Sequence, residues 1–150
     1  MSDESAVLDA NVLVFALLTD SAHHRAARAL LESAAEPSTR LCVTSQVLAE
    51  FFAIVTNAKR VSLPRTAPEA LEALRAITTL PGIKVLPTPP DVHTRWLALL
   101  KDHPVARARV FDLLLAATML ANNVRYIYTF NAADFEPLTD LRVLTPPNPA

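Results

Sequence analysis

Three acidic residues, Asp9, Glu50 and Asp112, lie inside stretches of the sequence that are otherwise apolar. Their surroundings read VLDANVLV, VLAEFFAIV and VFDLLLAA, respectively. An ionised carboxylate is costly to bury unless it pairs with a positive charge or coordinates a metal ion. The three acids are therefore candidate ligands of one metal site, provided that the fold brings them together.

Each acid also has a simpler interpretation. Asp9 could cap a helix that begins near Asn11, because an aspartate oxygen can accept a hydrogen bond from the free amides at a helix start. Glu50 could lie at the exposed border of an amphipathic helix. Asp112 could be favoured by the positive end of a helix macrodipole. The residue types alone leave both interpretations open.

Short apolar runs alternate with helical patterns along the chain, and this alternation favours a parallel sheet covered by helices on both faces. Strands are expected at residues 5–9, 41–44, 83–86, 126–130 and 142–145. Helices are expected at residues 11–18, from 20 or 21 to 35, 46–57, 66–78, 91–101 and 109–122. Asp20 or Ser21 and then Ser45 are expected as N-caps, and Thr66 begins a capping box with Glu69.

Such a sheet could bring the three acids to one edge, because sites in open α/β sheets form outside the carboxyl ends of the strands. Asp9 follows the first expected strand, and Glu50 lies about one turn into the helix after the second. Asp112 opens a helix that precedes a later strand.

The composition excludes several other kinds of site. The chain has one glycine, Gly82, whereas phosphate-binding P-loops, dinucleotide-binding turns and nucleophile elbows each need at least two. One cysteine, Cys42, provides neither a disulfide nor zinc-ligand spacing. The net charge of −1 argues against a tight, sequence-specific binder of nucleic acid, which would usually be basic.

The length of 150 residues and the 51% hydrophobic content predict one packed domain over residues 1–150, with its core at about residues 6–145. The start MSDES is acidic and lacks the positive segment of a secretory signal. No apolar run approaches the roughly 18 residues that a membrane span needs. We therefore expect no membrane association and a cytoplasmic location.

Four segments resemble, in order, the motifs of PIN-domain nucleases. They are LDANVL at 8–13, SQVLAEF at 45–51, FDLLLAAT at 111–118 and TFNAADF at 129–135. Within that family the chain looks most like the VapC-type toxins of prokaryotic toxin–antitoxin pairs. The resemblance implies a three-layer α/β/α sandwich with a central, mostly parallel sheet. It also implies that acids bind Mg²⁺ or Mn²⁺ and that RNA phosphodiester bonds are cleaved.

Asp9, Glu50 and Asp112 match the three best-defined acidic positions of the family. The family often has a fourth acid two residues after the threonine of the last motif, where this chain has Asn131. Asp134 belongs to the same motif and could contribute to the metal site. The asparagine puts a second metal ion in doubt.

Further residues are expected to support the acids or to contact RNA. Asn11 is expected to orient Asp9, and Thr129 to hydrogen-bond within the site. Four cationic residues near the acids could contact phosphates, although they could equally be solvated surface charges: Lys59, Arg60, Arg107 and Arg109. The four histidines are expected to take no part, because none has metal-ligand spacing.

The resemblance also implies partners, namely an RNA substrate and a cognate antitoxin, and we expect a homodimer. Phe15, Leu17 and Leu18 could line a groove for the antitoxin or a dimer contact, or could belong to the core.

An alternative is a catalytically weakened PIN-fold module that binds RNA or a protein partner, which Asn131 mildly favours. The sequence fits phosphatases of the haloacid-dehalogenase type less well, because they have a second aspartate where this chain has Asn11. It also fits receiver domains less well, because they have a lysine after a late strand.

Overall fold

The computed structural model describes residues 4–150, so residues 1–3 of the acidic start lie outside the described part of the chain. Five strands form one sheet in the order β3-β2-β1-β4-β5, and every neighbouring pair is parallel. The strands are β1 (Ala6–Leu8), β2 (Leu41–Thr44), β3 (Ile83–Leu86), β4 (Tyr126–Tyr128) and β5 (Arg142–Leu144).

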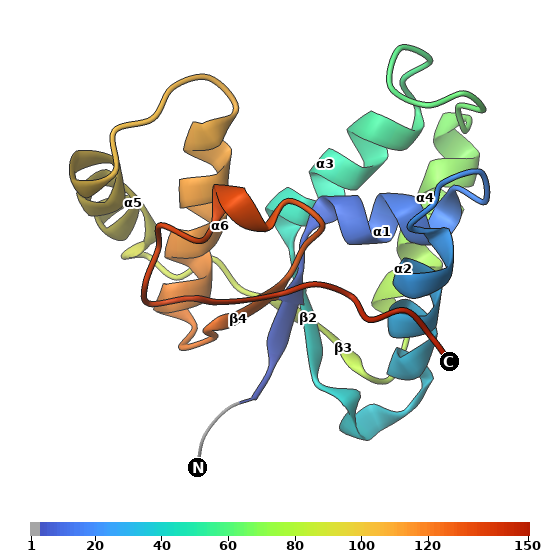
Figure 1. Ribbon diagram of the computed structural model, residues 1–150, viewed down its shortest axis with the longest axis horizontal. Helices are drawn as coiled ribbons and strands as arrows, with labels where there is room; N and C mark the ends of the chain where they lie inside the picture. The colour runs from blue at the N-terminus through green and yellow to red at the C-terminus, as the bar shows by residue number, and fades with distance from the viewer. Residues whose placement is uncertain (1–3) are drawn as a thin grey trace.

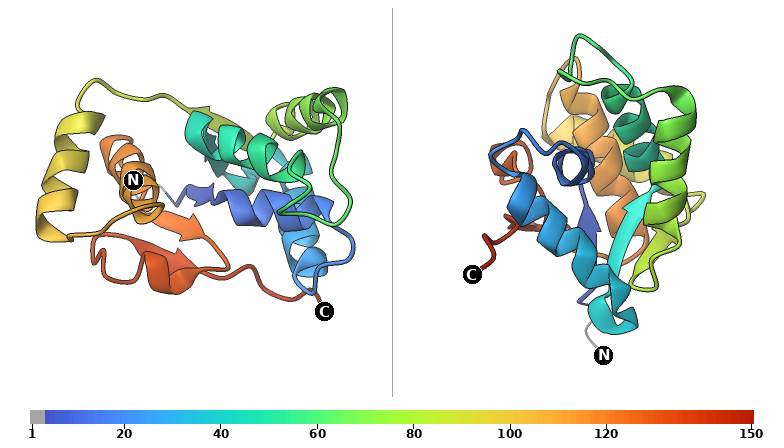
Figure 2. Two further views of the ribbon diagram at one scale, coloured as in Figure 1. Left: turned by 90° about the horizontal axis from the view of Figure 1, so that it is seen from above. Right: turned by 90° about the vertical axis from the view of Figure 1, so that its right-hand side faces the viewer.

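Within residues 4–150, six α-helices and three short 3₁₀ helices lie around the sheet. The α-helices are α1 (Ala10–Leu17), α2 (His24–Glu32), α3 (Ser45–Val55), α4 (Ala67–Thr78), α5 (Val92–Asp102) and α6 (Arg109–Ala121). The 3₁₀ helices are η1 (Ser33–Ala35), η2 (Pro37–Thr39) and η3 (Ala132–Asp134). Figures 1 and 2 show α5 and α6 on one side of the sheet and α1 to α4 on the other. The predicted three-layer α/β/α sandwich is therefore confirmed.

The core lies on both faces of the sheet, as expected for a parallel sheet between two helical layers. Val7, Val43 and Ile127 on the three inner strands are completely buried. Cys42 is also buried, in agreement with its apolar neighbours. Within residues 4–150, no helix is both long enough and apolar enough to cross a bilayer.

The order of the strands creates a switch point beside β1. The chain passes from β1 to β2 and β3 on one side, and then returns to place β4 on the other side of β1. Leu8 of β1 pairs with Tyr128 of β4, so the residues that follow them, Asp9 and Thr129, leave the sheet at the same level. Ligands of open α/β sheets bind at such points.

Of the N-caps expected for the second, third and fourth helices, one is observed and two differ. The capping box of Thr66 and Glu69 is formed, and α4 begins directly after Thr66. The expected cap Ser45 is wrong by one residue, because Thr44 accepts the Val47 amide and Ser45 is already helical.

The second helix begins later than expected, so neither Asp20 nor Ser21 caps it. It starts at His24, after a turn in which the Ser21 hydroxyl accepts the amide of His23. The Asp20 carboxylate instead accepts the hydroxyl of Ser62, 42 residues away. Both side chains are therefore used in the loop between α1 and α2.

Candidate metal centre

The acids predicted from the sequence surround one pocket at the carboxyl end of the sheet. Asp9 lies between β1 and α1, Glu50 comes from α3, Asp112 from the first turn of α6, and Asp134 from η3. The pocket has a volume of about 480 Å³. Its other lining residues are Ala10, Asn11, Ala53, Ile54, Arg60, Ala108, Arg109, Phe111 and Asn131. The fold thus collects carboxylates from four separate elements.

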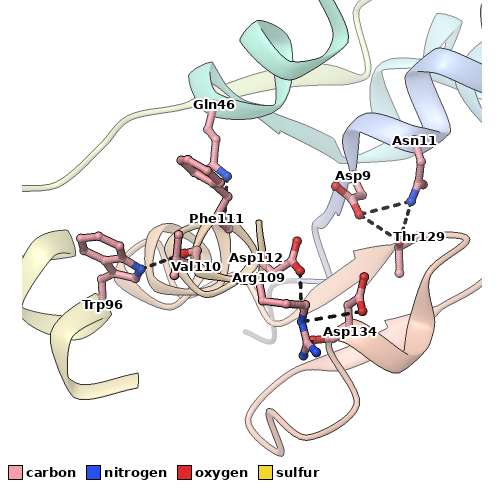
Figure 3. A network of polar contacts seen from close by, with 10 residues as sticks. All are labelled: Asp9, Asn11, Gln46, Trp96, Arg109, Val110, Phe111, Asp112, Thr129 and Asp134. Carbon is pink, nitrogen blue, oxygen red and sulfur yellow. Dashed lines mark hydrogen bonds and ion pairs between the residues drawn. The ribbon is translucent and has the colours of Figure 1, made fainter. Parts of the chain in front are cut away.

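Asp9 is both a helix cap and a member of this pocket. Its Oδ1 accepts the amide of Ala10 at 2.8 Å, and its Oδ2 accepts the hydroxyl of Thr129 at 2.9 Å. The Asn11 amide donates to the same Oδ2 at 3.4 Å and to the Thr129 hydroxyl oxygen at 3.1 Å. Figure 3 shows these three side chains together. The simpler interpretation of Asp9 as a cap and its place in the site are therefore compatible.

Asn11 also ties the first helix to the segment after β4. Its Oδ1 accepts the amide of Phe130 at 3.2 Å, while the Thr129 hydroxyl accepts the amide of Asn131 at 3.0 Å. These bonds explain why β4 ends at Tyr128 instead of at Phe130 as expected from the sequence. The Thr129 amide still donates to the Leu144 carbonyl of β5 at 2.9 Å, but the next amide, that of Phe130, is engaged by Asn11.

Glu50 and the start of α6 are joined by Gln46, a residue that sequence reasoning missed as part of the site. Its Nε2 donates to Glu50 Oε1 at 2.9 Å and to the Phe111 carbonyl at 2.8 Å. The spacing of four residues between Gln46 and Glu50 could have indicated the first of these bonds. From α5, the Trp96 indole donates to the Val110 carbonyl at 2.9 Å. Figure 3 shows Gln46 and Trp96 contacting the first turn of α6 from two different directions.

Arg109 lies among the acids. Its Nε is 3.5 Å from Asp112 Oδ2 and 3.7 Å from Asp134 Oδ1, and a terminal nitrogen donates to the Asp134 carbonyl at 3.2 Å. The Nε is buried and makes no hydrogen bond to any described residue. The positive charge of Arg109 therefore offsets part of the carboxylate charge in this structure.

The other predicted RNA contacts are placed differently. Arg60 is exposed and lines the pocket. Lys59 and Arg107 are also exposed, but they are not part of the pocket wall. Asn131 lines the pocket at the position where the family often has an acid. None of the four histidines lines it.

Burial, and then the neighbouring acids, raise the pKa of two carboxyl groups. Burial is the main cause of the raised pKa of Asp9, and hydrogen bonds from Thr129 and Ala10 act in the opposite direction. The pKa of Asp112 is raised to about 7, first by burial and then by the negative charges of Asp134 and Asp9, while Arg109 lowers it. A cation in the pocket would relieve this repulsion.

The donor set suits a hard divalent cation. Mg²⁺ and Mn²⁺ prefer carboxylate, amide and water oxygens, which are the polar groups present here. Among residues 4–150, no three Asp, Glu, His or Cys side chains are close enough to ligate one ion directly. Mg²⁺ usually takes only one or two carboxylates directly and keeps several waters. A pocket of about 480 Å³ has room for an ion whose waters hydrogen-bond to the remaining acids.

A family model for the PIN domain matches residues 6–138. The chain belongs to the PIN-domain family. The predicted family resemblance is thus confirmed, and the four acids of this PIN domain lie in the matched segment.

Relatives of known name cover nearly the whole of this PIN domain. Ribonuclease VapC24 of Mycobacterium tuberculosis is 30% identical over 140 residues, which cover 93% of this chain and 94% of that protein. Ribonuclease VapC43 of Mycobacterium tuberculosis is 32% identical over 123 residues, which cover 80% of this chain and 82% of that protein.

Solved structures share the fold of this PIN domain at lower identity. VapC20 of Mycobacterium tuberculosis, described as a sarcin–ricin loop cleaving toxin, aligns with a TM-score of 0.65 and 18% identity, covering 87% of this chain and 92% of that one. VapBC2 of Rickettsia felis, bound to a DNA fragment from its promoter, aligns with a TM-score of 0.67 and 20% identity, covering 93% and 97%.

Proposed function

We propose that this chain is a metal-dependent endoribonuclease and the toxin of a toxin–antitoxin pair. The observation that carries the proposal is the pocket in which Asp9, Glu50, Asp112 and Asp134 meet at the switch point of the sheet. Its support is the membership of the PIN-domain family and the relatives named as VapC ribonucleases. We further propose Mg²⁺ or Mn²⁺ as the cation.

Asp9, Glu50 and Asp112 would hold the cation, directly or through its waters, with Asp134 as a further acid and Asn131 as a neutral oxygen donor. A bound divalent cation supplies a nucleophilic hydroxide at neutral pH and stabilises negative charge on a phosphate. Asn11 and Thr129 keep Asp9 in one orientation through the hydrogen bonds to its Oδ2.

The cationic side chains complete the substrate site. Arg60 and Arg109 line the pocket and can donate to phosphate oxygens of an RNA backbone. Arg109 is now engaged by Asp112 and Asp134, so its charge becomes available to a phosphate when a cation takes those carboxylates. We propose Lys59 and Arg107, which are exposed outside the pocket, as contacts for more distant parts of the RNA.

We propose that a cognate antitoxin binds the face formed by α1 to α4. A toxin–antitoxin complex from Klebsiella pneumoniae contains a chain of this fold, which aligns with a TM-score of 0.62. On this face Leu17 lines an apolar pocket of about 230 Å³, with Leu31 and Phe51. Phe15 lies elsewhere, against His23 and Phe130. A homodimer, a single domain over residues 1–150 and a cytoplasmic location are also proposed.

A second candidate function rests on Asn131. Where the family often has an acid, this chain has a neutral side chain, which weakens a second metal ion and favours a PIN-fold module that binds RNA or a protein without cutting. The experiment that separates the two functions is incubation of structured RNAs with Mg²⁺, Mn²⁺ or EDTA. Cleavage that needs the metal supports the nuclease, and RNA binding without cleavage supports the module.

A further inference from the structure

The wall of the acidic pocket contains an exposed aromatic ring. Phe111 directly precedes Asp112 in α6, and its side chain is 53% exposed. The other large apolar side chains that are exposed within residues 4–150 are aliphatic and lie outside this pocket: Leu63, Leu71, Val85 and Leu97. A phenylalanine in this position gives up the stabilisation of burial, so the ring is available to a ligand.

Other apolar residues line the pocket together with Phe111. Ala53 and Ile54 of α3 line the same pocket as Phe111. The acids Asp9 and Asp112 form another part of its wall. The pocket therefore offers carboxylates for a cation and apolar surface for a flat group next to it.

The backbone that carries the ring is fixed. Gln46 donates to the Phe111 carbonyl at 2.8 Å, and Trp96 donates to the preceding carbonyl, that of Val110, at 2.9 Å. Figure 3 shows the Phe111 side chain next to Gln46, whereas Asp112 extends on the side of Asp9. The first turn of α6 thus presents a ring and a carboxylate at adjacent positions without reorganisation.

We propose that Phe111 is a nucleobase-binding residue, on which an unpaired base of the RNA stacks while the adjoining phosphate lies at the acids. The proposal rests on the function proposed above and adds to it a residue that contacts the substrate. Proteins that bind single-stranded RNA stack splayed bases on aromatic side chains, whereas bases inside a duplex are not accessible in this way. Phe111 would therefore contact a base that is unpaired in the bound RNA.

Steady-state cleavage of a loop-containing RNA tests this assignment. Base stacking on an aromatic side chain corresponds to a factor of ~5 to ~160 in affinity by alanine substitution. F111A should raise KM by a factor in this range and change kcat little, while F111Y and F111W should keep KM near that of the wild type. L97A, which removes a similarly exposed apolar side chain on α5, should change neither.

Binding measured without cleavage separates this proposal from the proposed nuclease. A short single-stranded RNA that contains 2-aminopurine is titrated onto the D9N protein in Mg²⁺. The fluorescence of 2-aminopurine should be quenched by D9N and D9N/F111W but not by D9N/F111A. This result supports stacking, whether or not the wild type cleaves RNA. Three results would overturn the proposal. D9N and D9N/F111A could bind the probe equally, D9N could fail to bind it, or F111A could have an unchanged KM. An F111A variant that loses a protein partner but not the RNA probe would also overturn it.

Discussion

The guanidinium of Arg109 lies between the carboxylates of Asp112 and Asp134, with its Nε 3.5 Å from one and 3.7 Å from the other. These distances describe ion pairs without hydrogen bonds from Nε, and the buried Nε has no other partner among the described residues. Arg109 therefore holds positive charge where a cation is expected. A terminal nitrogen donates to the Asp134 backbone carbonyl at 3.2 Å, but Nε makes no hydrogen bond to either carboxylate.

R109Q should bind Mn²⁺ more tightly than the wild type, because it removes a positive charge that competes for two carboxylates. Partly exposed ion pairs contribute up to ~1 kcal/mol, so the Kd should fall by roughly fivefold. Isothermal titration calorimetry measures this directly. R109K is the control that keeps the charge and should stay near the wild type. An equal or higher Kd in R109Q would show that Arg109 does not compete with the ion.

T129V should lower kcat by about 10- to 100-fold, the usual effect of removing a side chain that orients a metal ligand. The Thr129 side chain is completely buried, and its hydroxyl donates to Asp9 Oδ2 at 2.9 Å. Valine has the same shape without the donor. T129S retains the hydroxyl and should keep most of the activity. If T129V and T129S have the same kcat, the bond to Asp9 does not position the acid.

The metal-free protein should become less stable as pH rises from ~4 to ~7. The pKa of Asp112 is about 7 in the folded chain against an ordinary value of 3.8, so in this window the folded state binds the proton more tightly than the unfolded state. Losing that proton with rising pH therefore disfavours folding, and the raised pKa of Asp9 acts in the same direction. Thermal melts in EDTA across this range measure the effect. D112N should flatten the slope, and an unchanged slope would argue against the raised pKa.

G82A should lower the free energy of unfolding by about 1–3 kcal/mol, as forced overpacking does. A Cβ at Gly82 would lie 2.6 Å from the Glu36 carbonyl oxygen and 2.9 Å from that of Ala34. The clash is with backbone atoms of the segment before β2, which cannot rotate away as a side chain could. Urea unfolding of both proteins checks this, and a midpoint equal to the wild type would mean that the segment shifts at little cost.

Much of the fold could be predicted because it depends on local signals. The apolar strands β2 and β3 begin and end where the sequence indicated, and the capping box places the start of α4. Two of the shifted ends, the start of α2 and the end of β4, lie beside polar groups that are engaged by distant residues. Asp20 is bound by Ser62, and the amide of Phe130 by Asn11. Such partners are absent from a local pattern.

The acids of the site could be predicted as individual residues, but not their neighbours in space. Asp9, Glu50 and Asp112 are marked by the apolar runs around them, and Asp134 by the family motif. The position of Arg109 between two acids depends on how η3 packs against α6. The exposure of Phe111 was also hidden, because an apolar residue in a helix gives no sign in the sequence that it faces a pocket.

Cleavage of RNA by wild type and D112N tests the central claim most directly. Both proteins, free of any bound antitoxin, are incubated with a panel of structured RNAs in Mg²⁺, Mn²⁺ or EDTA. D102N, which changes an exposed aspartate at the end of α5, serves as the matched control. We expect metal-dependent cleavage by wild type and D102N, and only the EDTA level of cleavage by D112N. Cleavage by D112N equal to that of the wild type, or cleavage that persists in EDTA, would contradict it.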